Sequence, residues 1–266
     1  MSRITLSLAL WTAGLRSALQ YRTDTFIVIV MALAFQGTGF AFAWVLLSRF
    51  ESLAGWTLGQ VAFLYGLRLI VHAVAGVLTG PFFGLETQVR TGEFDRYLIR
   101  PLSPLLQFMT QRVEISIFGD LLGGVAIFIA ANQLVGLTWT PSAIGYLVLA
   151  IAGGALAEGA VRILIGALSF RFLASTSLLY LADSVFSTFA NYPLTIFGGI
   201  LQFLFTFGLP LAFVAYLPAT VLLDRTAELQ VNPALAYVAP AIGVLWIAIA
   251  VRVFNRELRT YQSAGS

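Results

Sequence analysis

Long apolar runs are the feature that most constrains how this chain folds. A helix needs about 20 apolar residues to cross the hydrocarbon core of a bilayer, and several runs here are that long. Only 10% of the residues are charged, whereas soluble domains carry about 25%. The chain is therefore predicted to be an all-α polytopic membrane protein. The clearest spanning runs cover 25–47, 61–83, 115–134, 144–170 and 235–253.

Two stretches are less regular than these runs. Residues 4–22 place Arg16 and Arg22 among apolar positions, which predicts a helix lying in the membrane interface. Between 172 and 223 the residues allow two layouts. Either 172–191 crosses the membrane and 194–223 forms a broken hairpin that dips back into it, or 172–191 lies along the inner face and 194–217 crosses.

The positions of the arginines favour six transmembrane helices. With six crossings and a cytoplasmic N-terminus, eleven of the fifteen arginines face the cytoplasm, two lie outside and two lie within spans. Short cytoplasmic loops carry an excess of positive charge in this way. A seventh crossing would put Arg252, Arg256 and Arg259 outside. We therefore expect a protein of the cell membrane with both termini in the cytoplasm, whose net charge of +3 reflects anchoring rather than nucleic-acid binding.

Missing residue types exclude several kinds of site. The sequence has no cysteine, so it offers neither disulfides nor thiolate chemistry. It has no lysine, which the phosphate-binding P-loop requires, so no standard ATPase site is expected. His72 is the single histidine, which excludes a multi-histidine metal site. We expect no metal, no cofactor and no catalytic residue in this chain.

Ionisable residues nevertheless lie within the apolar runs, where charges are costly and often functional. Glu158 and Arg162 have the i,i+4 spacing of a helical ion pair, which is either structural or part of a transport path. Arg68 and His72 share a helix face by the same spacing. Asp120 has no local base, and it can pair with an arginine across helices or face a watery cavity.

A polar stripe follows one face of 172–191. The stripe either lines a substrate path or packs against a neighbouring helix through its small and hydroxyl side chains. Asp183, which belongs to this stripe, is a second acid without a local base, able to pair with Arg68 or Arg162. The stripe consists of Thr176, Tyr180, Asp183, Ser187 and Asn191.

The segment 86–104 interleaves charges with apolar side chains between two spanning runs. Each charge would cost about 2.5–3.5 kcal/mol at the bilayer centre, so the segment faces water or another protein. The mixture is typical of a docking surface. Its aromatic and aliphatic residues would supply the buried anchor, and its arginines would orient the contact.

The sequence VRTGEFDRYLIRPLSPLLQF at 89–108 resembles the cytoplasmic pattern of the ABC-2 (type-2 exporter) permease family. The prolines in NYPLTIF at 191–197 and in LPLAFVAYLPATVLL at 209–223 are similar to the re-entrant stretch of that family. The resemblance covers essentially the whole chain. It implies that 1–266 form a single permease domain with 172–191 as the fifth span and 193–223 as a re-entrant hairpin on the outer side.

By this resemblance the chain is the permease of an ATP-driven exporter, and 86–104 form a coupling helix seated in a separate ATPase subunit. Two ATPase copies, which bind ATP and Mg, and a second permease chain, identical or related, are implied. The substrate path is expected at the interface between the permeases, near the second and fifth spans. The coupling positions carried over are Arg90, Gly92, Phe94, Asp95, Arg96, Leu98, Arg100 and Pro101.

Two other functions are compatible with the residues. An ion-coupled secondary carrier would use Glu158, Asp120 or Asp183, although no internal repeat typical of many carriers is found. If the protein were instead a membrane scaffold or sensor that transports nothing, neutralising these acids would leave all flux intact. The substrate class stays open among drugs, lipids, peptides and glycans.

Overall fold

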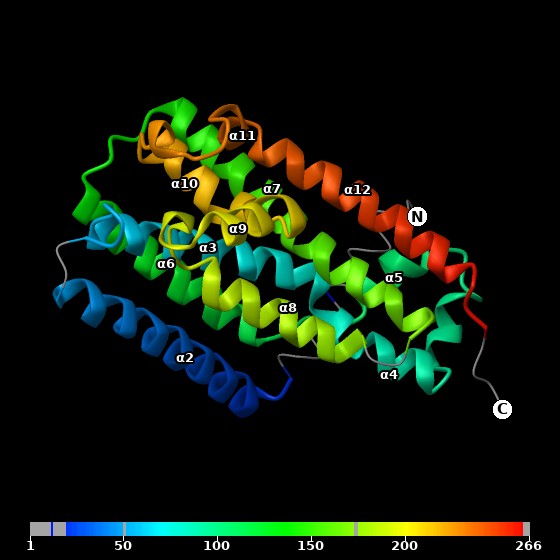
Figure 1. The fold of residues 1–266 in the computed structure, drawn as a ribbon. Coiled ribbons are helices and arrows are strands. Elements are labelled where there is room, and N and C mark those ends of the chain that lie inside the picture. The colour runs from blue at the N-terminus through cyan, green and yellow to red at the C-terminus, as the bar shows by residue number, and fades with distance from the viewer. Residues whose placement is uncertain (1–11, 13–19, 50–51, 173–174, 263–266) are drawn as a thin grey trace.

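The computed structural model describes residue 12 and residues 20–49, 52–172 and 175–262. Within these ranges the chain is helical and has no β-strand, which confirms the all-α prediction. The expected interfacial helix at 4–22 falls mostly outside them and stays a prediction. The longest described helices lie side by side (Figure 1): α2 (Arg22–Arg49), α3 (Leu58–Thr79), α6 (Ser116–Val135), α7 (Pro141–Ala167), α8 (Ser175–Phe189) and α12 (Ala239–Leu258).

Local sequence determines where the two central helices begin. Thr57 and Gln60 form a capping box at the start of α3, in which each side chain accepts a hydrogen bond from the other residue's backbone N–H. At the start of α7, the Thr140 hydroxyl accepts from the backbone N–H of Ala143, and Pro141 occupies the first turn. These caps satisfy N–H groups that the helices cannot pair internally.

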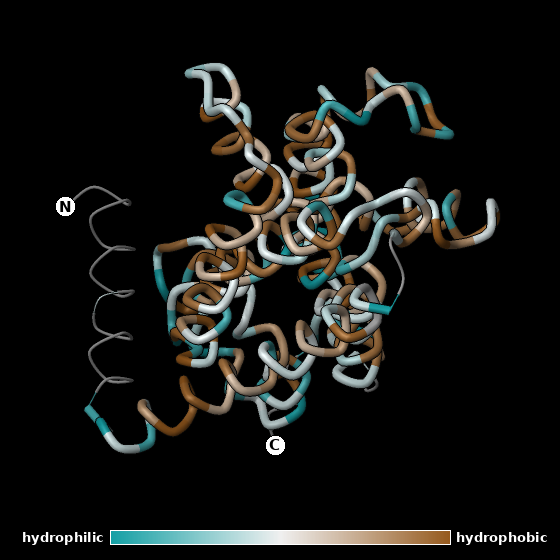
Figure 2. The backbone as a smooth tube through the Cα atoms, turned by 90° about the vertical axis from the view of Figure 1, so that its left-hand side faces the viewer, coloured by the Kyte–Doolittle hydropathy of each residue, from teal (hydrophilic) through white to brown (hydrophobic). Residues whose placement is uncertain are grey.

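Helices α3 and α7 form the centre of the bundle. Helix α6 packs along α3, α12 packs along α7, and α2 packs on the outside of α6. Most side chains of α3 are buried, whereas α2 exposes large apolar side chains such as Phe26 and Phe35. Figure 2, which views the bundle along its helices, shows hydrophobic residues on them throughout. Exposed apolar helix faces of this kind are suited to contact with lipid.

Glycines allow the central helices to approach closely. A Cβ atom added to Gly243 of α12 would lie 1.9 Å from the carbonyl oxygen of Gly153 in α7, and one added to Gly66 of α3 would lie 2.6 Å from the backbone nitrogen of Phe128 in α6. Small residues serve the same purpose at many helix contacts in membranes, where close van der Waals packing drives association.

The predicted coupling segment does not form one helix. It contains α4 (Leu85–Arg90), the 3₁₀ turn η2 (Glu93–Tyr97) and an irregular stretch before α5 (Pro104–Thr110), and it follows the 3₁₀ turn η1 (Gly80–Gly84). Gly92 separates α4 from η2 with a φ of 74°, in the left-handed region that other residues avoid. This corrects the expectation of a single coupling helix over 86–104.

The stretch between α8 and α12 is bent and interrupted. After the 3₁₀ turn η4 (Leu194–Ile196), the helical pieces Gly199–Gly208 and Ala212–Leu222 meet at 80°. The chain bends at Leu209–Leu211, where Pro210 supplies no backbone N–H. The first piece consists of α9 (Gly199–Phe203) and the π-helical η5 (Leu204–Gly208). The second consists of the π-helical η6 (Ala212–Tyr216) and α10 (Leu217–Leu222). The 3₁₀ turn η7 (Thr226–Glu228) and the short helix α11 (Ala234–Tyr237) follow.

Four described helices are long and apolar enough to cross a membrane, or five if the bent pair counts as one. The four begin at Arg22, Leu58, Ser116 and Pro141, and they overlap the predicted runs 25–47, 61–83, 115–134 and 144–170. The full count of six is not confirmed. Helix α8 has 15 residues and is only about 22 Å long at 1.5 Å per residue, and α12 ends in charged residues.

The Gly153–Gly243 contact leads to a stability prediction. Gly243→Ala would force the backbones of α7 and α12 apart, and overpacking of this kind costs about 1–3 kcal/mol. We expect a lower thermal unfolding midpoint of the purified protein in detergent. The matched control is Gly145→Ala, in a helical site of α7 with no atom within 4 Å of the added Cβ. Equal midpoints for the two variants would contradict the close crossing.

Candidate functional site

A cavity of about 540 Å³ lies between α2, α3, α8 and the start of α6. Its walls combine apolar residues of α2 with ionisable residues from the other helices. Among the residues predicted for a translocation path, those that line it are Arg68, His72, Arg162, Tyr180, Asp183 and Ser187. The sequence therefore identified residues that the fold brings together from three separate helices.

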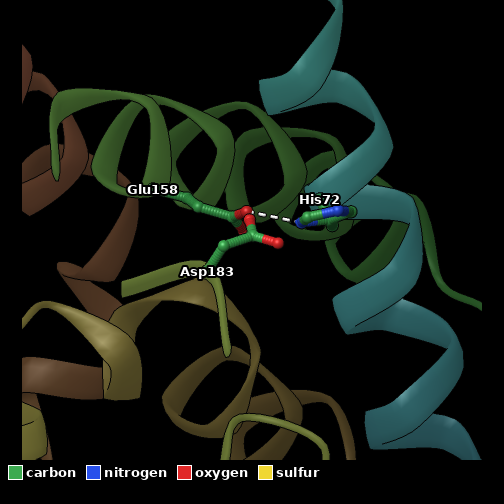
Figure 3. Close-up of side chains that lie close together, drawn as sticks. All are labelled: His72, Glu158 and Asp183. Carbon is green, nitrogen blue, oxygen red and sulfur yellow. Dashed lines mark hydrogen bonds and ion pairs between the residues drawn. The ribbon is translucent and has the colours of Figure 1, made fainter. Parts of the chain in front are cut away.

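A buried ion cluster forms one wall of this cavity. Arg162 Nη2 lies 2.8 Å from Glu158 Oε1 and 2.9 Å from Asp183 Oδ1. His72 Nδ1 lies 2.6 Å from the same Glu158 oxygen, and Figure 3 shows the side chains of His72, Glu158 and Asp183 pointing toward one another. The predicted i,i+4 pair of Glu158 and Arg162 is confirmed, and Asp183 takes the cross-helix pairing that the sequence left open.

His72 Nδ1 has three polar neighbours: Glu158 Oε1 at 2.6 Å, the Nη2 of Arg162 at 3.1 Å and the Nη2 of Arg68 at 3.5 Å. A protonated Nδ1 donates to the carboxylate and an unprotonated one accepts from an arginine, so the tautomer of His72 decides which of these contacts is a hydrogen bond. Arg68 is 1% exposed, and its Nε has no partner among the described atoms. The second carboxylate oxygen of Glu158, Oε2, also lacks a partner there, so the cluster is strongly polar but incompletely satisfied at Arg68 and at Glu158.

A metal ion is not the simplest occupant of the cluster. One atom each of His72, Glu158 and Asp183 lie within 4.8 Å of one another, close enough to bind a cation together. Arg162, however, contacts all three of these side chains. A guanidinium group at this position already supplies the positive charge that the two carboxylates require.

A second polar contact lies on the opposite wall. The side-chain amide of Gln36 in α2 donates to Asp120 Oδ1 of α6 at 2.8 Å. The Tyr65 hydroxyl of α3 donates to the backbone carbonyl of Gln36 at 3.3 Å. Both Gln36 and Asp120 are buried. Asp120 is thus hydrogen-bonded to an amide rather than paired with Arg68 or Arg162. The sequence signal for Gln36 was its position as the single interruption of the first apolar run.

The polar stripe of α8 serves more than one contact. Tyr180, Asp183 and Ser187 face the cavity. Thr176 is not among the residues that line it, and its backbone N–H donates to Glu86 at 2.7 Å. Asn191 lies after the end of α8 and donates to the backbone carbonyl of Ser187. The stripe is therefore a cavity wall in its middle and a structural contact at both ends.

Glu114 is a cavity residue that the candidate list from sequence omitted. It lines the main cavity and two neighbouring hollows of about 600 and 140 Å³, which extend to Gln111 and Arg112 at the end of α5. Its side chain is reached from these hollows, yet the surrounding protein removes much of its water and raises the pKa of the Glu114 carboxyl above its usual value. The hollows lead from the ion cluster toward the end of the bundle that carries 86–104.

Within 86–104, charged and aliphatic residues are exposed but Phe94 is not. Phe94 is 0% exposed and packs against Phe108, Phe170 and Tyr261 with ring centroids 5.2–6.1 Å apart. The expectation that Phe94 anchors a partner subunit is therefore corrected. The turn at Gly92 directs its ring into the chain's own core. The exposed residues are Thr87, Arg90, Thr91, Glu93, Arg96, Leu98, Ile99, Arg100, Pro101 and Ser103.

Asp95 also makes an internal contact. Its Oδ1 accepts a hydrogen bond from the Tyr261 hydroxyl at 2.9 Å, which ties the segment to the residues after α12. Arg96 donates to the Tyr97 hydroxyl at 2.7 Å and to the Gln111 side chain at 3.1 Å. The segment is thus fixed from inside, and its exposed surface is presented on a rigid support.

Comparison with known families agrees with this architecture. A family model described as ABC-2 family transporter protein matches residues 33–265. The chain belongs to the ABC-2 transporter family. No curated protein and no solved structure matches it. Family membership makes the chain a multi-pass membrane permease of an ABC transporter, since permeases of this family are membrane subunits without their own ATPase site and associate with an ABC ATPase.

The ion cluster predicts unequal effects of its two acids on stability. Glu158 has a side chain that is 2% exposed and Asp183 one that is 31% exposed. Removing one partner of a buried pair costs about 3–5 kcal/mol, so Glu158→Gln should lower the unfolding midpoint in detergent strongly and Asp183→Asn less. The control is Glu228→Gln, because its half-exposed pairing with Arg225 is of the surface type worth about 0–1 kcal/mol. A larger effect for Asp183→Asn would contradict the assignment of Glu158 as the buried centre.

Proposed function

We propose that this permease moves its substrate outward, driven by a separate ATPase that binds the exposed surface of 86–104. The observation that carries the proposal is that the cavity and its adjoining hollows reach from the buried ion cluster to the same end of the bundle as that surface. A substrate entering there would meet the side chains whose arrangement the ATPase can alter. The chain itself would perform no chemistry.

The exposed residues of 86–104 suit a docking contact. Ile99 is 84% exposed and Leu98 is 45% exposed, and arginines flank both. An apolar centre surrounded by charged groups is typical of interface anatomy, with arginine especially frequent at sites of high binding energy. In this proposal Leu98 and Ile99 take the anchoring role, while Arg90, Arg96 and Arg100 orient the ATPase.

A complete transporter of this kind would contain two ATPase subunits, each binding ATP and Mg, and a second permease chain, identical or related. We infer that α8 and α12 complete six crossings, because both lie alongside the helices that are long enough to span (Figure 1). An even number of crossings would put both ends of the chain in the cytoplasm, with 86–104. The bent stretch 193–223 would then re-enter the membrane from the outer side.

The substrate path would include Arg68, His72, Glu158, Arg162 and the middle of the α8 stripe. Intramembrane ionisable residues that face a cavity are characteristic of such paths. The alternative of an ion-coupled carrier is less well supported, because Glu158 and Asp183 are both engaged by Arg162 and Asp120 is hydrogen-bonded to Gln36. Each of the three thus already has one carboxylate oxygen bound to a side chain of the protein, although Glu158 Oε2 has no hydrogen-bond partner among the described atoms.

The docking surface gives a direct test. Ile99→Asp and Arg100→Glu should reduce co-purification of the ATPase and permease-stimulated ATP hydrolysis, because they place a charge at the anchor or reverse one beside it. Losing one interface hot spot costs about 2 kcal/mol or more, or about thirtyfold in affinity. Both residues are exposed, so thermal stability of the isolated permease should change little.

The matched control for this test is Arg49→Glu, the same substitution at the last residue of α2, at the opposite end of the bundle. It should leave ATPase binding intact. If both docking variants retain wild-type co-purification and stimulation, the assignment of 86–104 as the ATPase-binding surface is wrong.

A further inference from the structure

A hydrogen-bonded carboxylate joins the proposed docking segment to α8. Glu86 lies in the first turn of α4, and its Oε2 accepts from the Thr176 backbone N–H at 2.7 Å and from the Ser175 hydroxyl at 3.3 Å. Both donors are in the first turn of α8. A negative charge at this end of a helix interacts favourably with the unpaired N–H groups and with the helix dipole. The contact therefore depends both on the negative charge of Glu86 and on its position at the N-terminal end of α8.

The same part of the chain contacts α8 again one turn later. The Phe83 ring packs on Tyr180 with centroids 5.0 Å apart, and the Arg162 guanidinium lies 5.8 Å from the centre of the Phe83 ring. Asp183, a further turn along α8, then reaches Arg162. Residues 83–86 thus hold the beginning of α8, while its middle forms the cavity wall.

The remainder of the docking segment is attached elsewhere. Phe94 packs among aromatic residues of α5, of the 3₁₀ turn η3 (Leu168–Phe170) and of the chain after α12, and Asp95 bonds to Tyr261. These contacts join the segment to the chain just after α7 and just after α12. Glu86 is accordingly the charged side chain of the segment that lies directly against α8.

We propose that Glu86 is the positioning residue through which movement of 86–104 reaches α8 and changes access to the cavity. The inference rests on the proposed function, since it requires an ATPase that displaces the segment. Displacement of α4 would carry the first turn of α8 with it through Glu86. Tyr180, Asp183 and Ser187 would then shift relative to α2 and α3, and the cavity would widen or close.

A neighbouring contact provides a competing route. The hydroxyls of Ser169, in the 3₁₀ turn η3 (Leu168–Phe170), and Ser175 lie 2.5 Å apart, so α7 also contacts the start of α8. The Arg162–Asp183 ion pair joins the same two helices. If α7 rather than α4 moves α8, then Ser169→Ala or Asp183→Asn should have the effect that is expected here of a change at Glu86. The two routes are therefore separable by single substitutions.

The absence of cysteine from the chain permits a clean reporter. Ser187→Cys would place one thiol of this chain on the cavity face of α8, and its reaction with a water-soluble maleimide would be timed in the intact permease–ATPase complex. Rates would be compared without nucleotide and with ATP plus vanadate. Allosteric coupling typically changes an equilibrium by about 5–150-fold, so the parent should show at least about a fivefold change in rate.

Substitutions at Glu86 should reduce this response while ATP hydrolysis continues. We expect Glu86→Ala to lower the nucleotide-dependent change to less than about twofold, and Glu86→Gln to give an intermediate value because an amide oxygen still accepts the hydrogen bonds without the charge. The control is Glu228→Ala, which removes a half-exposed acid outside the docking segment, paired with Arg225 beside Gly55, and should respond as the parent does. Each variant must elute at the parent's size and retain the ATPase.

The outcomes distinguish the two levels of the proposal. A parent-like response in Glu86→Ala, or loss of the response only in Ser169→Ala or Asp183→Asn, overturns the role of Glu86 and leaves the proposed function standing. A parent that shows no nucleotide-dependent change, or binds no ATPase, overturns both. Should Glu86→Ala fail to fold, Glu86→Gln decides the question, and a response equal to that of the parent overturns the role.

Discussion

The charge of Arg162 is the constraint on which the arrangement of the bundle depends. A guanidinium group buried among transmembrane helices is very costly unless acids surround it. Glu158 neutralises it from the same helix, and Asp183 contributes from α8. Because α7 lies at the centre, Arg162 fixes the position of α8 relative to α7, and its partner Glu158 fixes that of His72 on α3. The cavity lies where these three helices present polar side chains and therefore cannot pack as an apolar core.

Features that depend on spacing within one helix could be predicted from the sequence. The apolar runs predicted the four helices that are long and apolar enough to cross a membrane, and the i,i+4 spacing predicted the Glu158–Arg162 pair. For contacts between helices the sequence offered only alternatives, because either Asp183 or Asp120 could have paired with an arginine of another helix. Their outcome depends on how the helices rotate about their axes. Hydropathy does not encode that rotation, and it is set by packing at residues such as Gly66 and Gly243.

The interior direction of Phe94 was beyond the reach of sequence patterns for a similar reason. Aromatic residues among charges are common both at docking surfaces and in small cores. The positive φ of Gly92 and the rings that converge from α5, η3 and the C-terminal residues decide between them. The span count was limited differently: 15 residues in α8 and charges at the end of α12 leave both helices outside the usual length and composition of a crossing.

The backbone contact between Gly153 and Gly243 has a mechanical consequence. Two helices whose main chains touch have no layer of flexible side chains to absorb sliding, so α7 and α12 should move as one body during a transport cycle. Tilting would then be left to elements joined by longer side chains, with α8 foremost among them, because Asp183 joins it to Arg162 of α7. The close contact of these two glycines thereby separates the permease into a pair of helices, α7 and α12, that move together and others that can tilt against them.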